Sequence, residues 1–337
     1  MKPTQSRVHS LENTMLQRRT LLRRALFALG TTSSTLTAAQ WPDRPVTMVI
    51  GFPPGGALDM QARDLARPLS AQLRQPVIVD NKPGAGQAIG AEAVARASKE
   101  GYIIGLIDSG PLTIGPHLRS LSYDPRKSFT PLGGVNKMPL VILSSIGSGI
   151  TSLAGLRRFA ATSERGVSYG SSGLGSIHHL VGELLRSRLE VDLTHVPYRG
   201  SSQALTDLVA GRISIMIAAL SSGLPMVRAG QAQAIGVTSP KRSEAAPTIP
   251  TLAEQGLDDF DAQGWTGLFA PKDIAPSKAA ALSAALQRSL ADPDFVQQAA
   301  RQGNTVLTGQ EEELRQLLVE DNTRWSRIIS ARGIRLE

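Results

Sequence analysis

Hydrophobic and polar positions alternate between strand-like and helix-like patterns from residue 46 onward. The apolar run at residues 46–50 predicts a strand, and apolar residues recurring every three or four positions from Leu58 to Leu73 predict a helix. Pro68 is expected to kink or split this helix, because proline has no amide hydrogen to donate. Two more strands with a helix between them follow, at residues 76–79, 102–107 and 91–97. This order indicates a parallel sheet covered by helices on both faces.

The same alternation repeats after residue 139. Short apolar segments predict strands at residues 139–144, 167–169, 193–197, 213–218 and 234–237. Helical patterns separate them, and the C-terminal region is mainly helical, at residues 279–290 and 314–329. We therefore predict an α/β fold with two lobes, each built on a mainly parallel central sheet flanked by helices. Trp265 and Trp325 are expected to be core anchors.

The N-terminal segment has the pattern of an export signal. Basic residues, including the pair Arg18-Arg19, precede a short apolar patch at residues 25–29 and small residues that end at Ala39. The paired arginines resemble a twin-arginine signal. We expect residues 1–39 to be removed on export, and no later stretch is long and apolar enough to span a bilayer. The sequence therefore predicts a protein of the periplasm.

Composition excludes several classes of function. The net charge is +8, but residues 1–39 hold six basic residues and one acidic residue, which leaves only +3 for the rest of the chain. With 4% aromatic residues, the remainder is a poor match to a nucleic-acid surface. The chain has no cysteine, and none of its five histidines lies in an H-E-x-x-H pattern. We expect no metal centre and no cofactor.

Three loops share a character that suits anions. Each follows a predicted strand, is rich in glycine or small polar residues, and opens a predicted helix, at residues 53–59, 83–90 and 171–179. The first amide groups of a helix lack partners and lie at the positive end of its dipole, so they attract carboxylates without arginine or lysine. Ser176 can add a hydroxyl donor.

Individual side chains near these loops have competing interpretations. Asp59 is expected to brace its loop rather than act as an acid or base. A structural hydrogen bond is favoured for His179 over a place in the cleft, and His178 is expected to be exposed. His195 is expected to pack in the core.

An oxidoreductase is the less favoured alternative. Residues 84–90 read G-x-G-x-x-x-G, with Asp108 at the end of the next predicted strand, which is similar to a dinucleotide fingerprint. The loop has one residue too many, however, and it lies in the second β-α unit after the signal. The chain also contains no P-loop and no G-x-S-x-G motif.

Several motifs together resemble one family. They read F-P-P-G-G-x-x-D from Phe52 to Asp59, N-K-P-G-A-G at residues 81–86, G-S-x-x-H-L at residues 175–180 and H-V-P-Y-R-G at residues 195–200. In combination and order they resemble the solute-binding proteins of tripartite tricarboxylate transporters, the Bug family. The resemblance implies a type II-like periplasmic binding protein whose two lobes close on a ligand in the cleft between them. The implied lobes are residues 40–140 plus 264–337, and residues 141–263.

The resemblance also implies the site and its partners. The ligand is expected to be a small organic carboxylate, delivered by a monomeric receptor to membrane permease subunits; a sensor receptor is the alternative partner. The implied ligand-binding residues are Phe52, Gly55, Gly56, Asp59, Gly84, Gly86, Ser109, Ser176, His179 and Tyr198.

Two positions depart from the family pattern. Ala218-Ala219 stands where relatives often have Asp-Asn, and Gln87-Ala88 stands where they often have Gly-Asn. Each change removes polar partners for a ligand. The sequence therefore predicts a ligand less polar than an amino acid or citrate, or one bound in another orientation.

Overall fold

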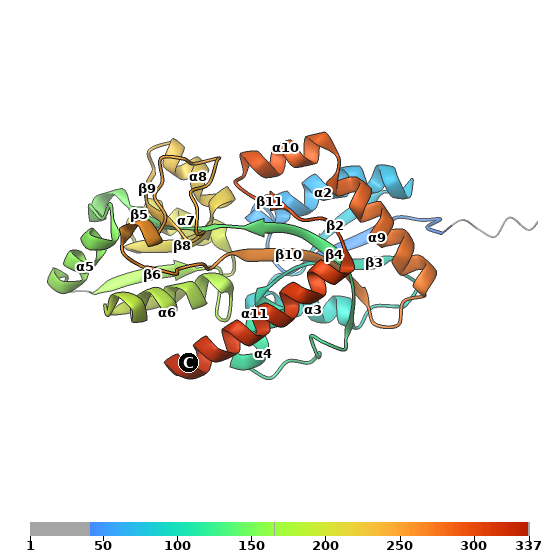
Figure 1. The fold of residues 1–337 in the computed structure, drawn as a ribbon, viewed down its shortest axis with the longest axis horizontal. Helices are drawn as coiled ribbons and strands as arrows, with labels where there is room; N and C mark the ends of the chain where they lie inside the picture. Colours follow the sequence, from blue (N-terminus) through green and yellow to red (C-terminus); the bar gives the residue numbers. More distant parts are fainter. Residues whose placement is uncertain (1–40, 165, 336–337) are drawn as a thin grey trace, which may run out of the picture. The chain divides into compact units, whose positions relative to one another are not determined.

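The computed structural model describes residues 41–164 and 166–335, so the predicted export signal at residues 1–39 lies outside the described residues. Two mixed β-sheets organise this part of the chain (Figure 1). Within it, no helix has the length and apolar character that crossing a membrane requires.

The first sheet has six strands in the order β11-β4-β10-β3-β1-β2. Strand β1 pairs in parallel with β2 and β3, whereas β10 pairs antiparallel with β3 and β4, and β11 pairs antiparallel with β4. The strands are β1 (Val46–Ile50), β2 (Val77–Asn81), β3 (Ile103–Asp108), β4 (Phe129–Met138), β10 (Gly264–Pro271) and β11 (Thr305–Val306).

The second sheet has five strands in the order β7-β6-β8-β5-β9. Strand β6 pairs in parallel with β7 and β8, and β5 pairs antiparallel with β8 and β9. The strands are β5 (Leu140–Ser145), β6 (Val167–Ser171), β7 (Leu193–Pro197), β8 (Ile215–Ala219) and β9 (Ala232–Val237).

The chain passes between the two sheets twice. Strand β4 of the first sheet is followed by β5 of the second with only Pro139 between them, and the chain returns from β9 to β10. A chain that leaves a sheet and comes back to it supplies strands of opposite direction, which explains the antiparallel pairs at β4, β5 and β10. The sequence predicted mainly parallel sheets; parallel pairing holds for β1–β3 and β6–β8, and the remaining strands make both sheets mixed.

Helices cover both faces of the first sheet. Because side chains alternate along a strand, Val49 of β1 contacts one helical layer while its neighbours Met48 and Ile50 point to the opposite face. The first layer contains α3 (Ala88–Ala95) and the start of α11 (Glu311–Arg332). Helices α2 (Ala57–Leu73), α9 (Pro276–Leu290) and α10 (Pro293–Arg301) pack against one another on the sheet, and α4 (Gly115–Leu118) follows the π-turn at residues 110–114.

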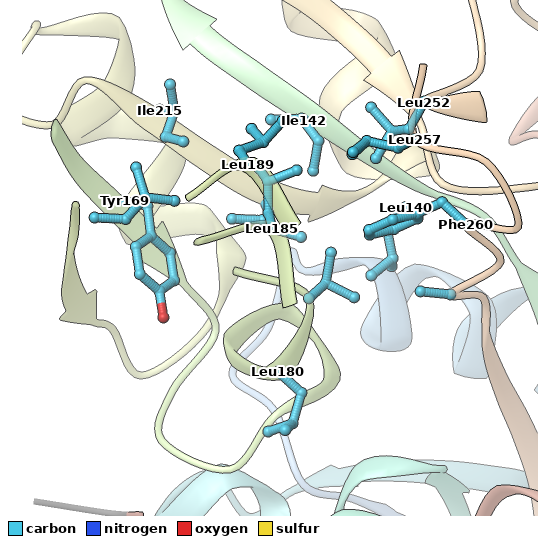
Figure 2. Packing of buried hydrophobic residues seen from close by; sticks show 14 of the residues in the cluster. Leu140, Ile142, Tyr169, Leu180, Leu185, Leu189, Ile215, Leu252, Leu257 and Phe260 are labelled. Atoms are coloured by element: carbon cyan, nitrogen blue, oxygen red, sulfur yellow. The ribbon is translucent and has the colours of Figure 1, made fainter. Parts of the chain in front are cut away.

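A large cluster of buried side chains joins the second sheet to helix α6 (Ile177–Leu189). Leu140 and Ile142 of β5, Tyr169 of β6 and Leu185 of α6 belong to it (Figure 2). Trp325 near the C-terminal end of α11 packs in the same cluster and is fully buried. Helices α7 (Ser201–Val209) and α8 (Leu220–Arg228) pack around the other face in a second cluster, and α5 (Leu153–Thr162) joins the first.

Most strands and helices lie where the sequence placed them, and both tryptophans predicted as core anchors are buried. Pro68 does not split its helix, because α2 runs through it as one helix of 17 residues. Pro68 is itself buried, beside the core residues Leu65 and Leu69. Burial of this apolar face outweighs the single backbone hydrogen bond that proline removes.

Candidate functional site

Loops from both sheets meet around an enclosed space that we call the central cavity. It has a volume of about 20 Å³, which holds roughly one water molecule. Its lining comes from the loop after β1, the end of β3, the β4–β5 crossing, the junction of β8 and α8, and the starts of α2, α6 and α7. The lining residues are Phe52, Pro53, Gly56, Ala57, Leu58, Asp108, Met138, Leu140, Ile177, His178, Gly200, Ser201 and Ala219.

Helix starts without a side-chain cap reach the central cavity from both sheets: α2 from the first, and α7 and α8 from the second, although the first amide of α8 already donates to the Pro139 carbonyl. Helix α2 begins after Gly56 and α7 begins after Gly200, and neither glycine provides a side-chain cap. The residues of their first turns, including Ala57 and Ser201, line the cavity. Amide groups in the first turn of a helix have no partner within the helix and lie at the positive end of its dipole. This pair of helix starts is therefore suited to a carboxylate.

The start of α6 is occupied by its own loop. The Ser176 hydroxyl accepts a hydrogen bond from the His179 amide at 3.3 Å and donates one to the Gly173 carbonyl at 2.7 Å. Ser176 is 1% exposed and does not line the central cavity. In this structure its hydroxyl caps the helix, and the predicted role of Ser176 in ligand binding stays a prediction. The helix starts of the second sheet that carry no side-chain cap are those of α7 and α8, and the sequence analysis did not identify them.

The glycine loops of the two sheets contact each other beside a second cavity of about 210 Å³, which we call the glycine-loop cavity. A Cβ atom added at Gly86 would lie 2.5 Å from the carbonyl oxygen of Leu174. The Arg119 guanidinium donates to the Ala85 carbonyl at 3.0 Å and also to the Leu174 carbonyl, so it joins the two loops. The lining residues are Gly51, Phe52, Gly84, Ala85, Gly86, Gln87, Arg119, Ser172, Gly173, Leu174, Pro197, Tyr198 and Arg199.

Phe52 lines both cavities, and Tyr198 lines the second. The Tyr198 hydroxyl donates to the Asp207 carboxylate at 2.8 Å. Burial, together with this hydrogen bond, raises the pKa of Tyr198 to about 12, so the hydroxyl stays protonated. The hydroxyl hydrogen is used in the bond to Asp207, so Tyr198 contributes its ring to the glycine-loop cavity.

Asp59 braces the loop after β1 and does not line either cavity. Its carboxylate accepts from the Gly55 amide at 2.9 Å, from the Asn81 side chain at 3.0 Å and from Arg63 at 2.9 and 3.0 Å. Burial raises the pKa of this carboxyl, but the hydrogen bonds from Arg63, Gly55 and Asn81 outweigh it and hold the pKa below its ordinary value. The Gly55 amide is thus used inside the loop, and Gly56 is the glycine of this motif that reaches the central cavity.

Replacing Asp59 should loosen the loop that carries the start of α2. We expect Asp59→Ala to lower the free energy of unfolding by about 2 kcal/mol, because Arg63, Asn81 and the Gly55 amide all lose their common acceptor. The control is Asp80→Ala, which removes a surface pair with Lys82 and should cost less than about 1 kcal/mol. Urea unfolding followed by circular dichroism measures both, and equal losses would contradict this role of Asp59.

Asp108 is the last residue of strand β3 and Ser109 follows it, and the two side chains have different surroundings. Ser109 is fully buried, its hydroxyl has no hydrogen-bond partner, and it lines neither cavity. Asp108 lines the central cavity and accepts from the Gly110 amide at 2.9 Å. Burial raises the pKa of Asp108 to about 6, although the Gln87 side chain and the Gly110 amide act in the opposite direction.

Of the two adjacent histidines of α6, only His178 lies in a place that was not expected. His178, expected to be exposed, is 6% exposed and lines the central cavity. His179 instead accepts from the Gly175 amide and stacks on His195 with 4.1 Å between ring centroids. It lines a separate cavity of about 530 Å³ that it shares with Glu183. The favoured structural interpretation of His179 agrees with this geometry, and burial lowers the pKa of both histidines of α6 to about 4.

The residues that the structure describes contain no group of three or more histidine, aspartate or glutamate side chains that could hold a metal ion. With uncapped helix starts from both sheets at one cavity, the arrangement is suited to a small anion.

Comparison with known proteins decides the family. The sequence profile of the tripartite tricarboxylate transporter family receptor matches residues 61–334. The chain belongs to this receptor family. A protein from the tcbD-tcbE intergenic region of Pseudomonas sp. (strain P51) is 37% identical over 307 residues, 90% of this receptor and 91% of the relative. The resemblance found in the sequence is confirmed, and the family is one of solute-binding receptors, not of enzymes.

Solved structures share the fold. The periplasmic binding protein BugD has a TM-score of 0.84 and 32% sequence identity, covering 88% of this receptor and all of that chain. A Rhodopseudomonas palustris structure, MatC with bound malate, has a TM-score of 0.82 and 30% identity, covering 86% of this receptor and all of that chain. Another R. palustris structure, with adipate, has a TM-score of 0.84 and 30% identity over 88% of this receptor and all of that chain. The predicted fold class is therefore confirmed.

The structure brings five of the ten predicted ligand residues to the two cavities and leaves five outside them. Those that line a cavity are Phe52, Gly56, Gly84, Gly86 and Tyr198; those that do not are Gly55, Asp59, Ser109, Ser176 and His179. Asp108, His178 and Ser201 line the central cavity and were not predicted as ligand residues. Asp108 could have been found from its place at the carboxyl end of a parallel strand, where ligands of α/β folds bind.

Proposed function

We propose that this protein is a periplasmic receptor that binds a small organic carboxylate in the central cavity and delivers it to a tripartite tricarboxylate-type permease. The observation that carries the proposal is the convergence of two uncapped helix starts, at Gly56 and Gly200, on one enclosed space. Relatives of the same fold have been solved with malate and with adipate, which are both carboxylates.

The chemistry of the central cavity supports an anionic ligand with an apolar body. The helix starts supply amide donors, and their strength increases when water is excluded around them. Most of the remaining lining is hydrocarbon, from side chains such as Leu58, Met138 and Ile177. A carboxylate would thus be held at its charged end by backbone groups, while the rest of the solute contacts apolar side chains.

We propose that binding requires two lobes to separate and close again. The lobes are residues 40–140 plus 264–337, and residues 141–263, and each contains one of the two sheets. A space of about 20 Å³ is too small for an organic acid, so the loops around it have to part to admit one. The contacts of Gly86 with Leu174 and of Arg119 with both loops support a closed form in which the ligand is sealed from water.

Export and the membrane partner complete the proposal. The basic and apolar pattern of residues 1–39 fits a cleavable signal for transfer to the periplasm. Membership of the transporter receptor family supports partnership with permease subunits. Under this proposal the protein captures its solute outside the inner membrane and hands it over without altering it.

Isothermal titration calorimetry on residues 40–337 tests the function. The panel contains mono-, di- and tricarboxylates, aromatic acids and amino acids at pH 7.5. We expect at least one carboxylate to bind with a dissociation constant of about 10 μM or below, and to raise the melting temperature, since 100-fold excess over that constant adds about 2.7 kcal/mol. Unchanged melting temperatures and no heat across the whole panel would contradict the proposal.

A further inference from the structure

Two ionisable side chains line the central cavity, one from a strand of the first sheet and one from a helix that packs on the second sheet, within a lining that is otherwise mainly apolar. Asp108 comes from the end of β3, and His178 from the first turn of α6. They are 5% and 6% exposed, respectively. Buried ionisable groups in an apolar cavity are costly unless a partner satisfies them, so their presence at a ligand site bears on what the ligand carries.

Asp108 has acceptor capacity that the described residues do not use. One oxygen accepts from the Gly110 amide. The Gln87 side chain lies close enough to favour the ionised carboxyl, yet its own amide atoms are buried without a hydrogen bond of ordinary geometry. No arginine, lysine or charged histidine among the described residues acts on this carboxyl. An ionised carboxylate has about four acceptor sites, so capacity remains for a donor from a bound molecule.

His178 leaves one ring nitrogen without a hydrogen-bond partner. Its Nδ1 atom lies 2.5 Å from the Ser172 hydroxyl, while Nε2 is buried without a hydrogen-bond partner. The ring is neutral at neutral pH because burial lowers its pKa to about 4. When the Ser172 hydroxyl donates to Nδ1, Nε2 carries the hydrogen and can donate to a carboxylate. The cavity thus has an acceptor, Asp108, for a donor on the ligand, and a donor, His178 Nε2, for a carboxylate on the same ligand.

We propose that Asp108 accepts a hydrogen bond from a hydroxyl or ammonium group of the ligand, so that this cleft selects substituted carboxylates over unsubstituted ones. This inference rests on the proposed function, because it assigns a specificity-determining residue within the same cavity. An unsubstituted acid would place hydrocarbon against Asp108 and leave the buried carboxylate without its partner. A site built around such a hydrogen bond discriminates strongly against the analogue that lacks the donor.

Matched four-carbon ligands test the selectivity by calorimetry at pH 7.5. One series is succinate, malate and aspartate; the other is butyrate, 2-hydroxybutyrate and 2-aminobutyrate. In whichever series binds, we expect a substituted member to bind at least about 10-fold more tightly than the unsubstituted acid. The hydroxyl and ammonium members show which donor Asp108 meets.

Asp108→Asn tests the residue. In this variant the asparagine oxygen can keep the hydrogen bond from the Gly110 amide. The asparagine NH2 group then stands where the free carboxylate oxygen was, and a donor on the ligand would face another donor. We expect the preference to fall below about 3-fold, whereas Asp80→Asn at the surface pair with Lys82 leaves it unchanged. An unsubstituted acid that binds wild-type protein as tightly as its substituted analogues, or a preference kept in Asp108→Asn, would overturn this inference alone. Failure of every carboxylate to bind would overturn the proposed function as well.

Discussion

Gly86→Val is expected to weaken binding of the carboxylate ligand by roughly 100-fold, equivalent to about 2.7 kcal/mol. A Cβ atom at Gly86 would lie 2.5 Å from the Leu174 carbonyl oxygen, which belongs to the loop of the other sheet. The backbone fixes the position of the Cβ atom, and the Leu174 oxygen is itself a backbone atom, so neither can rotate away as the end of a flexible side chain could. The two loops would have to separate, and a ligand that binds the closed form best loses that part of its affinity.

Gly211→Val is the matched control for this substitution. Gly86 and Gly211 both have left-handed backbone, with φ of 57° and 69°, but a Cβ atom at Gly211 would meet nothing within 4 Å. Each variant should therefore lose about 1–2 kcal/mol of stability from backbone strain, and only Gly86→Val should lose affinity. Calorimetry with the tightest ligand of the carboxylate panel measures the difference. Equal affinities in the two variants would show that contact between the glycine loops does not contribute to binding.

Acid is expected to destabilise the protein by several kcal/mol between pH 6.5 and about 4. Burial lowers the pKa of His178 and His179 to about 4 and that of His195 to about 3, and a second cause for His195 is its stacking neighbour His179. In the unfolded chain these histidines take up protons near pH 6.5, whereas the folded protein resists protonation until about pH 4. Their contribution to stability is therefore complete above pH 6.5 and decreases as the pH falls.

Asp108 acts in the opposite direction over part of this range. Burial raises its pKa to about 6, so the folded protein keeps this proton when the unfolded chain has lost it. Its contribution makes the protein more stable as the pH falls from about 6 toward 4. Burial also raises the pKa of Asp321, which acts in the same direction as Asp108. Three histidines with strongly lowered pKa values outweigh these two aspartates, and the net effect is loss of stability in acid.

Urea unfolding at pH 7 and pH 5 measures the loss of stability in acid. The variant His195→Gln tests whether the buried histidines cause it. His195 contacts Ser171 at 2.7 Å and stacks on Tyr169 and His179, so its replacement removes one titrating group from the cluster. The difference in unfolding free energy between the two pH values should shrink in this variant. His117→Gln on α4, where the histidine contacts Asn322, is the control and should keep the wild-type difference. A wild-type protein equally stable at both pH values would contradict the prediction.

Local patterns were enough to place most strands and helices. Strand β1 was predicted at residues 46–50 and lies at Val46–Ile50, because a short apolar run next to a glycine-rich turn has few alternatives. Strand β4 was not predicted, since its sequence contains Pro131 and two glycines that weaken a strand pattern. It forms because β10 and β11 pair with it from distant parts of the chain.

The candidate site was predictable only in part. The sequence identified the loops of Gly56 and Gly86, because glycine-rich turns between a strand and a helix are visible in the residues themselves. It could not tell that Ser176 uses its hydroxyl to cap α6, because a cap and a ligand donor have the same sequence pattern. The relative places of His178 and His179 were equally hidden, since neighbours in the first turn of a helix point in different directions.

The sequence by itself determined the family, the α/β class and the glycine loops, because each depends on residues close together in the chain or on motifs in a fixed order. The tertiary structure decided which helix starts remain uncapped, that Asp108 and His178 face one cavity, and that β4, β5 and β10 make both sheets mixed. These features depend on which groups, far apart in the chain, compete for the same hydrogen bonds and the same buried space. That competition is settled only when the chain has folded.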